Sequence, residues 1–257
     1  MDVGDAPYQG MLDALSCEVV GFEPVEEECR RLNAAAQPGF RFLPHVIGDG
    51  SDQTFHECAY AYNSSLLEPN VEFLARFTDL DTLFDVVEKR SVRTRRLDDI
   101  PEAAGTDLLK MDVQGGELMV LQGAQNLLRD VLVVHTEACF APLYRKQPLF
   151  ADLDRELRAA GFAFNSFVYF GGYPLKPLPV VDRNHAALQN QPLWCDVVYV
   201  RDYAKLDALS PAQLLKYAAI LHENYKSHGL ASAALGEYDR RSGTALQARY
   251  LGALGIA

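Results

Sequence analysis

The sequence predicts an α/β fold: a seven-stranded, mostly parallel sheet whose last strand is antiparallel, followed by a helical C-terminal extension. Strand-like and helix-like segments alternate repeatedly up to Gly161, as they do in parallel sheets with right-handed crossovers. Two strand-like segments then follow in succession, at residues 162–170 and 193–200, and beyond Arg201 the composition shifts to helix formers. A five-stranded doubly wound sheet does not need that final pair of strands, whereas a seven-stranded sheet with an antiparallel last strand does.

The alternation begins at the N-terminus and loosens between residues 53 and 99. Loops of that kind over the active end of a sheet often carry substrate contacts. The expected segments are the end of a strand at 2–5, a helix at 7–15, a strand at 18–23, a helix at 25–36, a strand at 40–47, a short strand at 55–58 and an edge strand or hairpin at 84–97.

Residues 108–124 combine a short buried strand, an acid at its carboxyl end, a glycine-containing turn and an amphipathic helix. In an open α/β sheet, ligands bind at the carboxyl ends of the strands, and Gly115 and Gly116 allow the backbone to approach a ligand closely. Asp112 is therefore a candidate ligand contact, and the alternative is that it caps the helix that follows.

The second half of the chain completes the sheet and adds the extension. We place one domain at residues 1–202 and the helical extension at residues 203–257. The expected segments are an apolar strand at 131–137, a helix at 149–161 that ends at Gly161, the two consecutive strands, a helix that begins after the N-cap Ser210, and a helix at 245–254.

Composition narrows the class of protein. The chain has 257 residues, of which 49% are hydrophobic, so it can bury a substantial core. A net charge of −11 argues against binding to nucleic acid or to an anionic membrane. The five cysteines are scattered and lack CxxC spacing, which favours a reducing cytoplasm over a disulfide framework. No apolar run is long enough to span a bilayer.

Acids end several successive strands. Asp2-x-Gly4 precedes Glu23 by about one strand–helix unit, and an acid at that position can accept both hydroxyls of a ribose. Asp49, in Gly48-Asp49-Gly50, ends the third strand, where it can accept a hydrogen bond from an adenine amino group or form a plain Asp-Gly turn. The GxGxxG fingerprint is missing, which disfavours a nicotinamide dehydrogenase. A crevice lined by carboxylates suits a cationic ligand such as a sulfonium.

These motifs together resemble the FkbM family of adenosylmethionine-dependent methyltransferases. The resemblance is carried by Asp2-Val3-Gly4, Phe22-Glu23-Pro24, Ile47-Gly48-Asp49-Gly50, Thr94-Arg95-Arg96-Leu97-Asp98-Asp99 and Lys110-Met111-Asp112-Val113-Gln114-Gly115-Gly116-Glu117. It implies a class I methyltransferase fold, a Rossmann-like sheet, and methyl transfer from S-adenosyl-L-methionine, typically to a hydroxyl oxygen. By the family pattern the cofactor site is lined by Asp2, Gly4, Glu23, Asp49 and Asp112.

Two departures from the family pattern concern the first motif. Asp5-Ala6-Pro7 stands where the family usually has Ala-Asn after its first glycine, which places an extra acid beside the methionine end of the cofactor. The chain also begins inside the motif, with only Met1 to Val3 for a strand that should be central in the sheet. We hypothesise that residues upstream of Met1 complete this strand.

Methyl transfer needs an acceptor oxygen held near the methyl group and a base for its proton. Asp112 sits at the right strand end to position the acceptor. His135 and Glu137 share one face of the next strand, and we rank Glu137 first as the base because it is nearer the carboxyl end; a lone histidine in an apolar strand is more often a core residue. The expected acceptor contacts are Glu117, placed near the site by the resemblance, Tyr144 and Gln147. No metal constellation is apparent, and we predict no metal.

We therefore expect a cytoplasmic methyltransferase that acts on an oxygen of a small molecule or glycan, with no nucleic-acid or membrane partner. The extension exposes amphipathic helices that must bury their apolar face on the core or on a second subunit, as in a homodimer. Two other functions stay open: a non-catalytic binding module that keeps the fold, and, third, a nicotinamide-dependent oxidoreductase.

Overall fold

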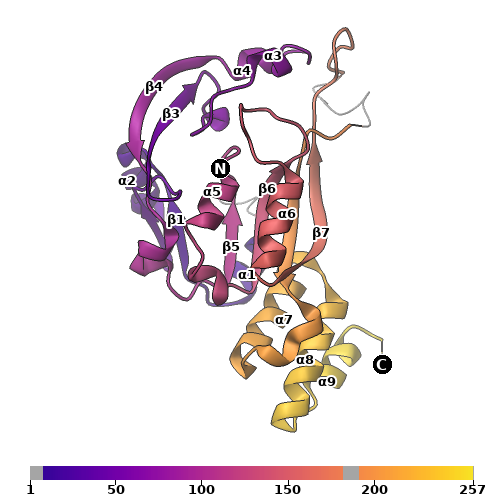
Figure 1. The fold of residues 1–257 in the computed structure, drawn as a ribbon. Coiled ribbons are helices and arrows are strands. Elements are labelled where there is room, and N and C mark those ends of the chain that lie inside the picture. Colours follow the sequence, from indigo (N-terminus) through magenta and orange to yellow (C-terminus); the bar gives the residue numbers. More distant parts are fainter. Residues whose placement is uncertain (1–7, 182–190, 257) are drawn as a thin grey trace.

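The structure is a computed structural model that describes residues 8–181 and 191–256 (Figure 1). The strands of these residues form three separate sheets. A parallel pair joins β1 (Val19–Phe22) to β2 (Phe40–Leu43). An antiparallel ribbon joins β3 (Asp52–Cys58) to β4 (Val86–Arg93), so the segment expected as an edge strand or hairpin forms a single strand that pairs with β3.

The main sheet has four strands in the order β5-β6-β8-β7. β5 (Leu108–Met111) runs parallel to β6 (Val133–Cys139), and β8 (Trp194–Arg201) lies antiparallel between β6 and β7 (Phe162–Gly171). The two final strands of the chain therefore pair with each other, and the antiparallel last strand predicted from the sequence is confirmed.

The expected single seven-stranded sheet is not continuous in the described part of the chain. The β1–β2 pair is not hydrogen-bonded to the β5–β6–β8–β7 sheet. The first predicted strand, expected at the centre of the sheet, falls on residues outside the described ranges. The two sheets still share one core, because Val20 and Phe22 of β1 pack against the same cluster as Met111 of β5.

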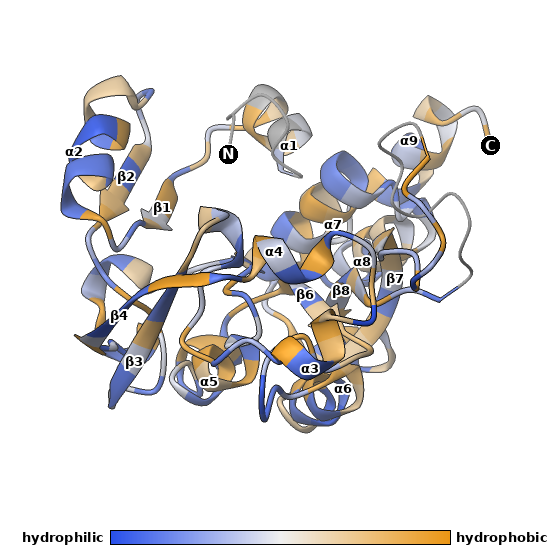
Figure 2. Ribbon diagram, turned by 90° about the horizontal axis from the view of Figure 1, so that it is seen from above, coloured by the Kyte–Doolittle hydropathy of each residue, from blue (hydrophilic) through white to orange (hydrophobic). Residues whose placement is uncertain are grey.

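Most helices follow the apolar periodicities of the sequence. The outer surface of α2 carries charges of both signs and is hydrophilic (Figure 2). None of the described helices is long and apolar enough to cross a membrane. The α-helices are α1 (Gln9–Ala14), α2 (Glu26–Ala35), α3 (Val71–Leu74), α4 (Leu80–Leu83), α5 (Glu117–Gln122), α6 (Phe150–Ala159), α7 (Pro211–Tyr225), α8 (His228–Ser242) and α9 (Leu246–Ala253), with 3₁₀ turns at Ala61–Asn63, Leu97–Asp99, Pro101–Ala103, Leu127–Arg129 and Tyr203–Ala208.

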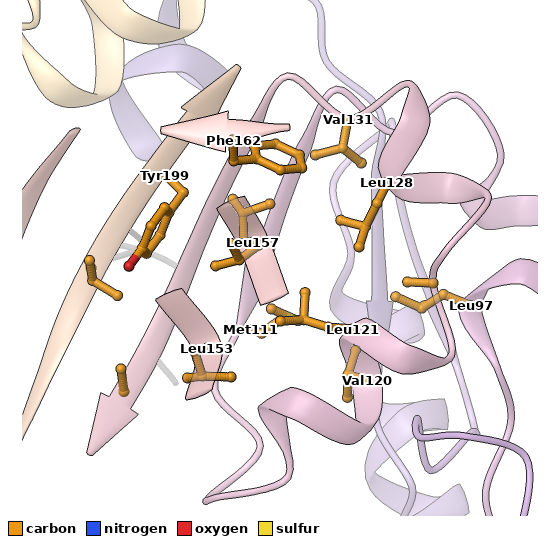
Figure 3. Close-up of a cluster of buried hydrophobic side chains, with 14 of the residues drawn as sticks. Leu97, Met111, Val120, Leu121, Leu128, Val131, Leu153, Leu157, Phe162 and Tyr199 are labelled. Atoms are coloured by element: carbon orange, nitrogen blue, oxygen red, sulfur yellow. The ribbon is translucent and has the colours of Figure 1, made fainter. Parts of the chain in front are cut away.

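One face of the main sheet is covered by α5 and α6, which bury a continuous apolar cluster (Figure 3). α6 contributes Leu153 and Leu157, and the strands contribute alternate residues that include Val134 and Val197. Tyr199 belongs to the same cluster, and its hydroxyl donates to Asp154 of α6 over 2.7 Å. This cluster fixes the positions from which β5 and β6 present their carboxyl ends.

The opposite face is covered by the helical extension. Ser210 caps α7 as predicted, because its hydroxyl accepts the Gln213 backbone N–H. α7 then buries Leu214 and Leu221 against Val198 of the sheet, so the extension packs on the core of its own chain. The sequence did not predict α8, whose alanines and glycines give little apolar periodicity. Gly236 of α8 permits close packing on α9.

Candidate active site

The turn between β5 and α5 is the centre of the candidate site. Gln114 and Gly115 both adopt the left-handed conformation, with φ of 54° and 90°. The left-handed conformation favours glycine at position 115, and a side chain there would also be tightly packed, since it would begin 3.0 Å from Gln147 Nε2 and 3.1 Å from the Tyr144 ring. The Ser65 hydroxyl donates to the Gln114 carbonyl over 2.6 Å and fixes the turn from outside.

Glu117 lies beneath this turn and is 4% exposed. Its Oε1 accepts the backbone N–H groups of Val113 (3.0 Å) and Gly115 (3.2 Å). Burial is the main reason why the pKa of Glu117 rises to about 7, and the two N–H groups counter it. The side chain therefore holds the shape of the turn, while its contact with an acceptor stays a prediction.

Three carboxylates converge here. One oxygen each of Asp112, Glu117 and Glu137 can be chosen so that all lie within 4.8 Å of one another. Burial, reinforced by the charges of Asp112 and Glu117, raises the pKa of Glu137 well above its usual range. Carboxylates at such spacing repel one another's charge, and the negative charge of Asp112 accordingly adds to burial in raising the pKa of both Glu117 and Glu137. The structure thus brings together two of the predicted catalytic residues, Asp112 and Glu137.

These three carboxylates are also close enough to contact one cation. Among the described residues no histidine or cysteine joins the group within that distance. Exposed acidic groups of this kind are common without an ion, and spacing alone does not identify them as metal ligands. The absence of a metal therefore stays a prediction.

His135 is placed differently from Glu137, although both lie on the same face of β6. It is 1% exposed, and both ring nitrogens have partners: Nε2 lies 3.3 Å from Asp196 Oδ2 and Nδ1 lies 3.3 Å from the Tyr225 hydroxyl. A histidine held on both sides is a poor candidate for contact with an acceptor. The interpretation of His135 as a buried, hydrogen-bonded core residue fits these contacts better than a role as the base.

The predicted acceptor residues Tyr144 and Gln147 are buried supports of the turn. Tyr144 is 1% exposed, and its hydroxyl lies 2.9 Å from the Asn63 carbonyl and 3.1 Å from Gln114 Oε1. Gln147 Oε1 accepts the Tyr144 backbone N–H over 3.1 Å. Both side chains therefore shape the site from behind in this structure, and their contact with an acceptor is untested.

The predicted cofactor residues fall in two groups. Glu23 follows β1, and its Oε1 accepts the Val25 backbone N–H over 2.8 Å. Asp49 lies exposed between β2 and β3, where hydrogen bonds from the Ser51 side chain and backbone help to lower the pKa of its carboxyl group. Each carboxylate supports its own turn, and since a carboxylate has two oxygens this does not preclude ligand binding. Asp2 and Gly4 lie outside the described residues.

Residues 6–164 match the family model of the Methyltransferase FkbM domain, which is more than half of the chain. The chain belongs to the FkbM methyltransferase family. Members of this family are adenosylmethionine-dependent methyltransferases, so the enzyme class is assigned, and the resemblance seen in the sequence is confirmed. No curated protein and no solved structure matches the chain.

Several motif segments of the FkbM domain contact the segments around the candidate site. A side chain at Gly123 would begin 2.1 Å from the Gly48 carbonyl oxygen, so the end of α5 and the 47–50 turn touch through glycine. Asp98 of the Leu-Asp-Asp step accepts the backbone N–H groups of Asn126 and Leu127 (2.9 to 3.1 Å). Part of the motif set therefore builds the scaffold of the site.

Sequence reasoning missed Lys110 and Asp196, which lie beside Glu137. Lys110 interrupts the apolar strand β5, and Asp196 interrupts the apolar run of β8. Burial tends to raise the pKa of Asp196, but its hydrogen bond to His135 and the charge of Lys110 prevail and hold that pKa below its ordinary value. A charged residue inside an otherwise apolar strand was the available signal.

Proposed function

We propose that the FkbM domain transfers the methyl group of S-adenosyl-L-methionine to a hydroxyl oxygen of a small molecule or sugar, with Glu137 as the base. The observation that carries the proposal is the convergence of Asp112, Glu117 and Glu137 at the carboxyl ends of β5 and β6. That position is where open α/β sheets bind ligands. A hydroxyl acceptor needs a proton acceptor there, and the buried Glu137 supplies one with a raised pKa.

The residues of the cofactor side fit a cationic cofactor. Glu23 and Asp112 are carboxylates directly after strand ends, Asp49 lies in the turn between β2 and β3, and the φ of Gly115 allows the backbone to approach a ligand. Bound adenosylmethionine supplies an electrophilic methyl group on a sulfonium. Asp112 would hold the cofactor or the acceptor hydroxyl beside that methyl group, because its carboxylate is the member of the trio that is exposed.

The proton released in the reaction determines the roles proposed for Glu137 and Glu117. As the hydroxyl oxygen bonds to the methyl carbon and the carbon–sulfur bond breaks, the O–H proton passes to Glu137. Burial raises the pKa of Glu137 well above its ordinary value, so its carboxylate is a stronger base than an exposed one. Glu117 stays fixed by two backbone N–H groups and acts on Glu137 through its charge.

Calorimetric titration tests the cofactor. We expect adenosylmethionine to bind and NADH not to bind, and we expect Glu23→Ala to weaken adenosylmethionine binding about tenfold or more through the loss of ribose contacts. Glu27→Ala, an exposed acid on α2, is the matched control and should bind like the wild type. Binding of NADH instead would favour an oxidoreductase, and unchanged binding by Glu23→Ala would remove Glu23 from the site.

Methylation of a panel of hydroxyl compounds and monosaccharides, followed by mass spectrometry, tests the base. We expect Glu137→Gln to lower the rate on any accepted compound by about 10²-fold or more, with adenosylmethionine affinity unchanged. Glu156→Gln is the control, because this half-buried acid of α6 accepts a hydrogen bond from Gln125 and is not part of the carboxylate trio. A Glu137→Gln enzyme with wild-type turnover on an accepted hydroxyl would contradict the proposal.

A further inference from the structure

A row of ionisable residues crosses the main sheet on the face that the extension covers. The strand register pairs Lys110 with His135 across β5 and β6, and Glu137 with Asp196 across β6 and β8. Directly paired residues of neighbouring strands point to the same face of a sheet. Val133, Val198 and neighbouring residues continue this face as an apolar surface under α7, so the polar row begins where the apolar packing ends.

Asp196 is the junction of this row. Its Oδ2 lies 3.3 Å from His135 Nε2 and 3.9 Å from Lys110 Nζ. The Lys110 and Asp196 side chains are only 19% and 25% exposed, so their ion pair is partly shielded from water. An ion pair in this environment is held more strongly than one on the open surface.

The extension fixes the other end of the row. Tyr225, the last residue of α7, places its hydroxyl 3.3 Å from His135 Nδ1, and the two rings meet edge to face at 5.8 Å. Tyr225 therefore orients the imidazole that in turn contacts Asp196. Both Tyr225 and Asp196 lie beyond residue 164, outside the matched FkbM domain.

Besides burial, the charged side chains around Glu137 determine how readily its carboxyl group ionises. Asp112, after β5, Glu117, of α5, and Asp196, of β8, all disfavour its ionised form. Lys110 of β5 is the cation that opposes them. Among the described residues, further titratable groups near this region are His135 and the Cys139 thiol on β6, the Cys195 thiol on β8, and the hydroxyls of Tyr144 and Tyr225.

We propose that Asp196 and Lys110 are positioning residues for methyl transfer: held by His135 and Tyr225, their ion pair fixes the charge balance beside Glu137. This inference rests on the proposed role of Glu137 as the base. It makes β8 and the end of α7 part of the catalytic unit, because the residues that balance the site come from both.

Carbon-13 NMR of the glutamate side-chain carboxyls tests the proposal without an acceptor. The Glu137 signal is assigned by its loss in Glu137→Gln, and its titration midpoint is then followed in the full-length protein. We expect Lys110→Met to raise the midpoint by about one pH unit, because an opposing cation is lost, and Asp196→Asn to lower it by a similar amount, because a neighbouring anion is lost. A general disturbance of packing would not give shifts of opposite sign.

The controls use a second ion pair that joins the extension to the same sheet. Lys216 of α7 lies 2.8 Å from Asp107, which precedes β5. Lys216→Met and Asp107→Asn should leave the Glu137 midpoint unchanged. Tyr225→Phe, which removes only the hydroxyl, should alter the ring-nitrogen signals of His135, whereas Tyr238→Phe should not.

Two outcomes overturn the proposal. One is a Glu137 titration midpoint that is the same in Lys110→Met and Asp196→Asn as in the wild type, and the other is a midpoint that shifts in the same direction in both variants. If Lys110→Met fails to fold, Lys110→Gln and Asp196→Asn carry the same test. The base role is judged separately. If the midpoint shifts as expected but Glu137→Gln still methylates, the electrostatic role stands and the proposed chemistry falls.

Discussion

The two faces of the main sheet are built from the same strands and differ in what they bury. Toward α5 and α6 the strands present a largely apolar surface that includes Val134 and Val197, with the buried Thr136 as a polar member. Toward the extension they present an apolar surface only under α7, and then Lys110, His135, Glu137 and Asp196 near the carboxyl ends of β5 and β6. Alternation along a strand allows the two faces to be composed independently.

This difference in composition indicates that the stability of the fold depends mainly on the apolar face. Burial of apolar area is the main favourable term in folding, whereas buried ionisable groups are costly unless they are paired and hydrogen-bonded. The polar row meets that condition only partly, because Glu137 stands among three other carboxylates. We therefore expect substitutions on the apolar face to cause the largest losses of stability, and substitutions in the polar row to act mainly on chemistry.

The largest expected loss of stability is on the apolar face. Leu157 of α6 is fully buried, so Leu157→Ala should lower the free energy of unfolding by about 3 kcal/mol through lost transfer energy and the cavity left behind. Chemical denaturation measures this. Leu215→Ala on the exposed side of α7 should cost less than about 1 kcal/mol. Comparable losses in the two variants would break the distinction between core and surface.

The buried Glu117 should make the stability of the protein depend on pH. The pKa of Glu117 is about 7 in the folded protein, against an ordinary value of 4.5. Between these values the folded state binds more protons than the unfolded state, so this group makes stability fall as pH rises from about 4.5 through 7. The full penalty, present above pH 7, amounts to about 3 kcal/mol.

Glu117→Gln removes the titrating group and keeps an oxygen for the two backbone N–H groups. Relative to the wild type, the variant should gain stability by up to about 3 kcal/mol between pH 5 and pH 8. Denaturation series at several pH values measure the difference, and Glu27→Gln on the surface of α2 should show none. A difference independent of pH would mean that Glu117 titrates normally.

Much of the fold could be predicted from the sequence because its signals are local. Apolar periodicity located the strands of the described residues and most of their helices, and Ser210 with Pro211 marked the start of α7. The sheet could not be predicted as it stands, since pairing between distant strands is not a local property. α8 was missed because its alanines, glycines and polar residues lack a clear apolar stripe, and its packing depends on a contact between Gly236 and Gln247.

The candidate site was predicted in part. Asp112 and Glu137 follow from their places at strand ends, and the structure brings them together. Lys110 and Asp196 were missed because their pairing depends on β8 inserting beside β6, which no local pattern shows. Tyr144 and Gln147 are buried by tertiary packing, which no local pattern shows, and their contact with an acceptor stays a prediction.

The smallest expected change in stability, and the sharpest test of the two faces, is the double variant Lys110→Met with Asp196→Leu. Replacing a shielded ion pair by apolar side chains is often neutral or stabilising, whereas removing one partner alone leaves an uncompensated charge. We therefore expect each single variant to lower the free energy of unfolding by more than the double variant does, and the double variant to lie within about 1 kcal/mol of the wild type. The Lys216→Met, Asp107→Leu double variant is the control for a more exposed pair, where single and double variants should differ little.

A large stability loss in the Lys110, Asp196 double variant would show that the polar row holds the fold together, and the separation of roles between the two faces would fail. A stable double variant that no longer methylates would show that this ion pair is maintained by the chemistry of the site.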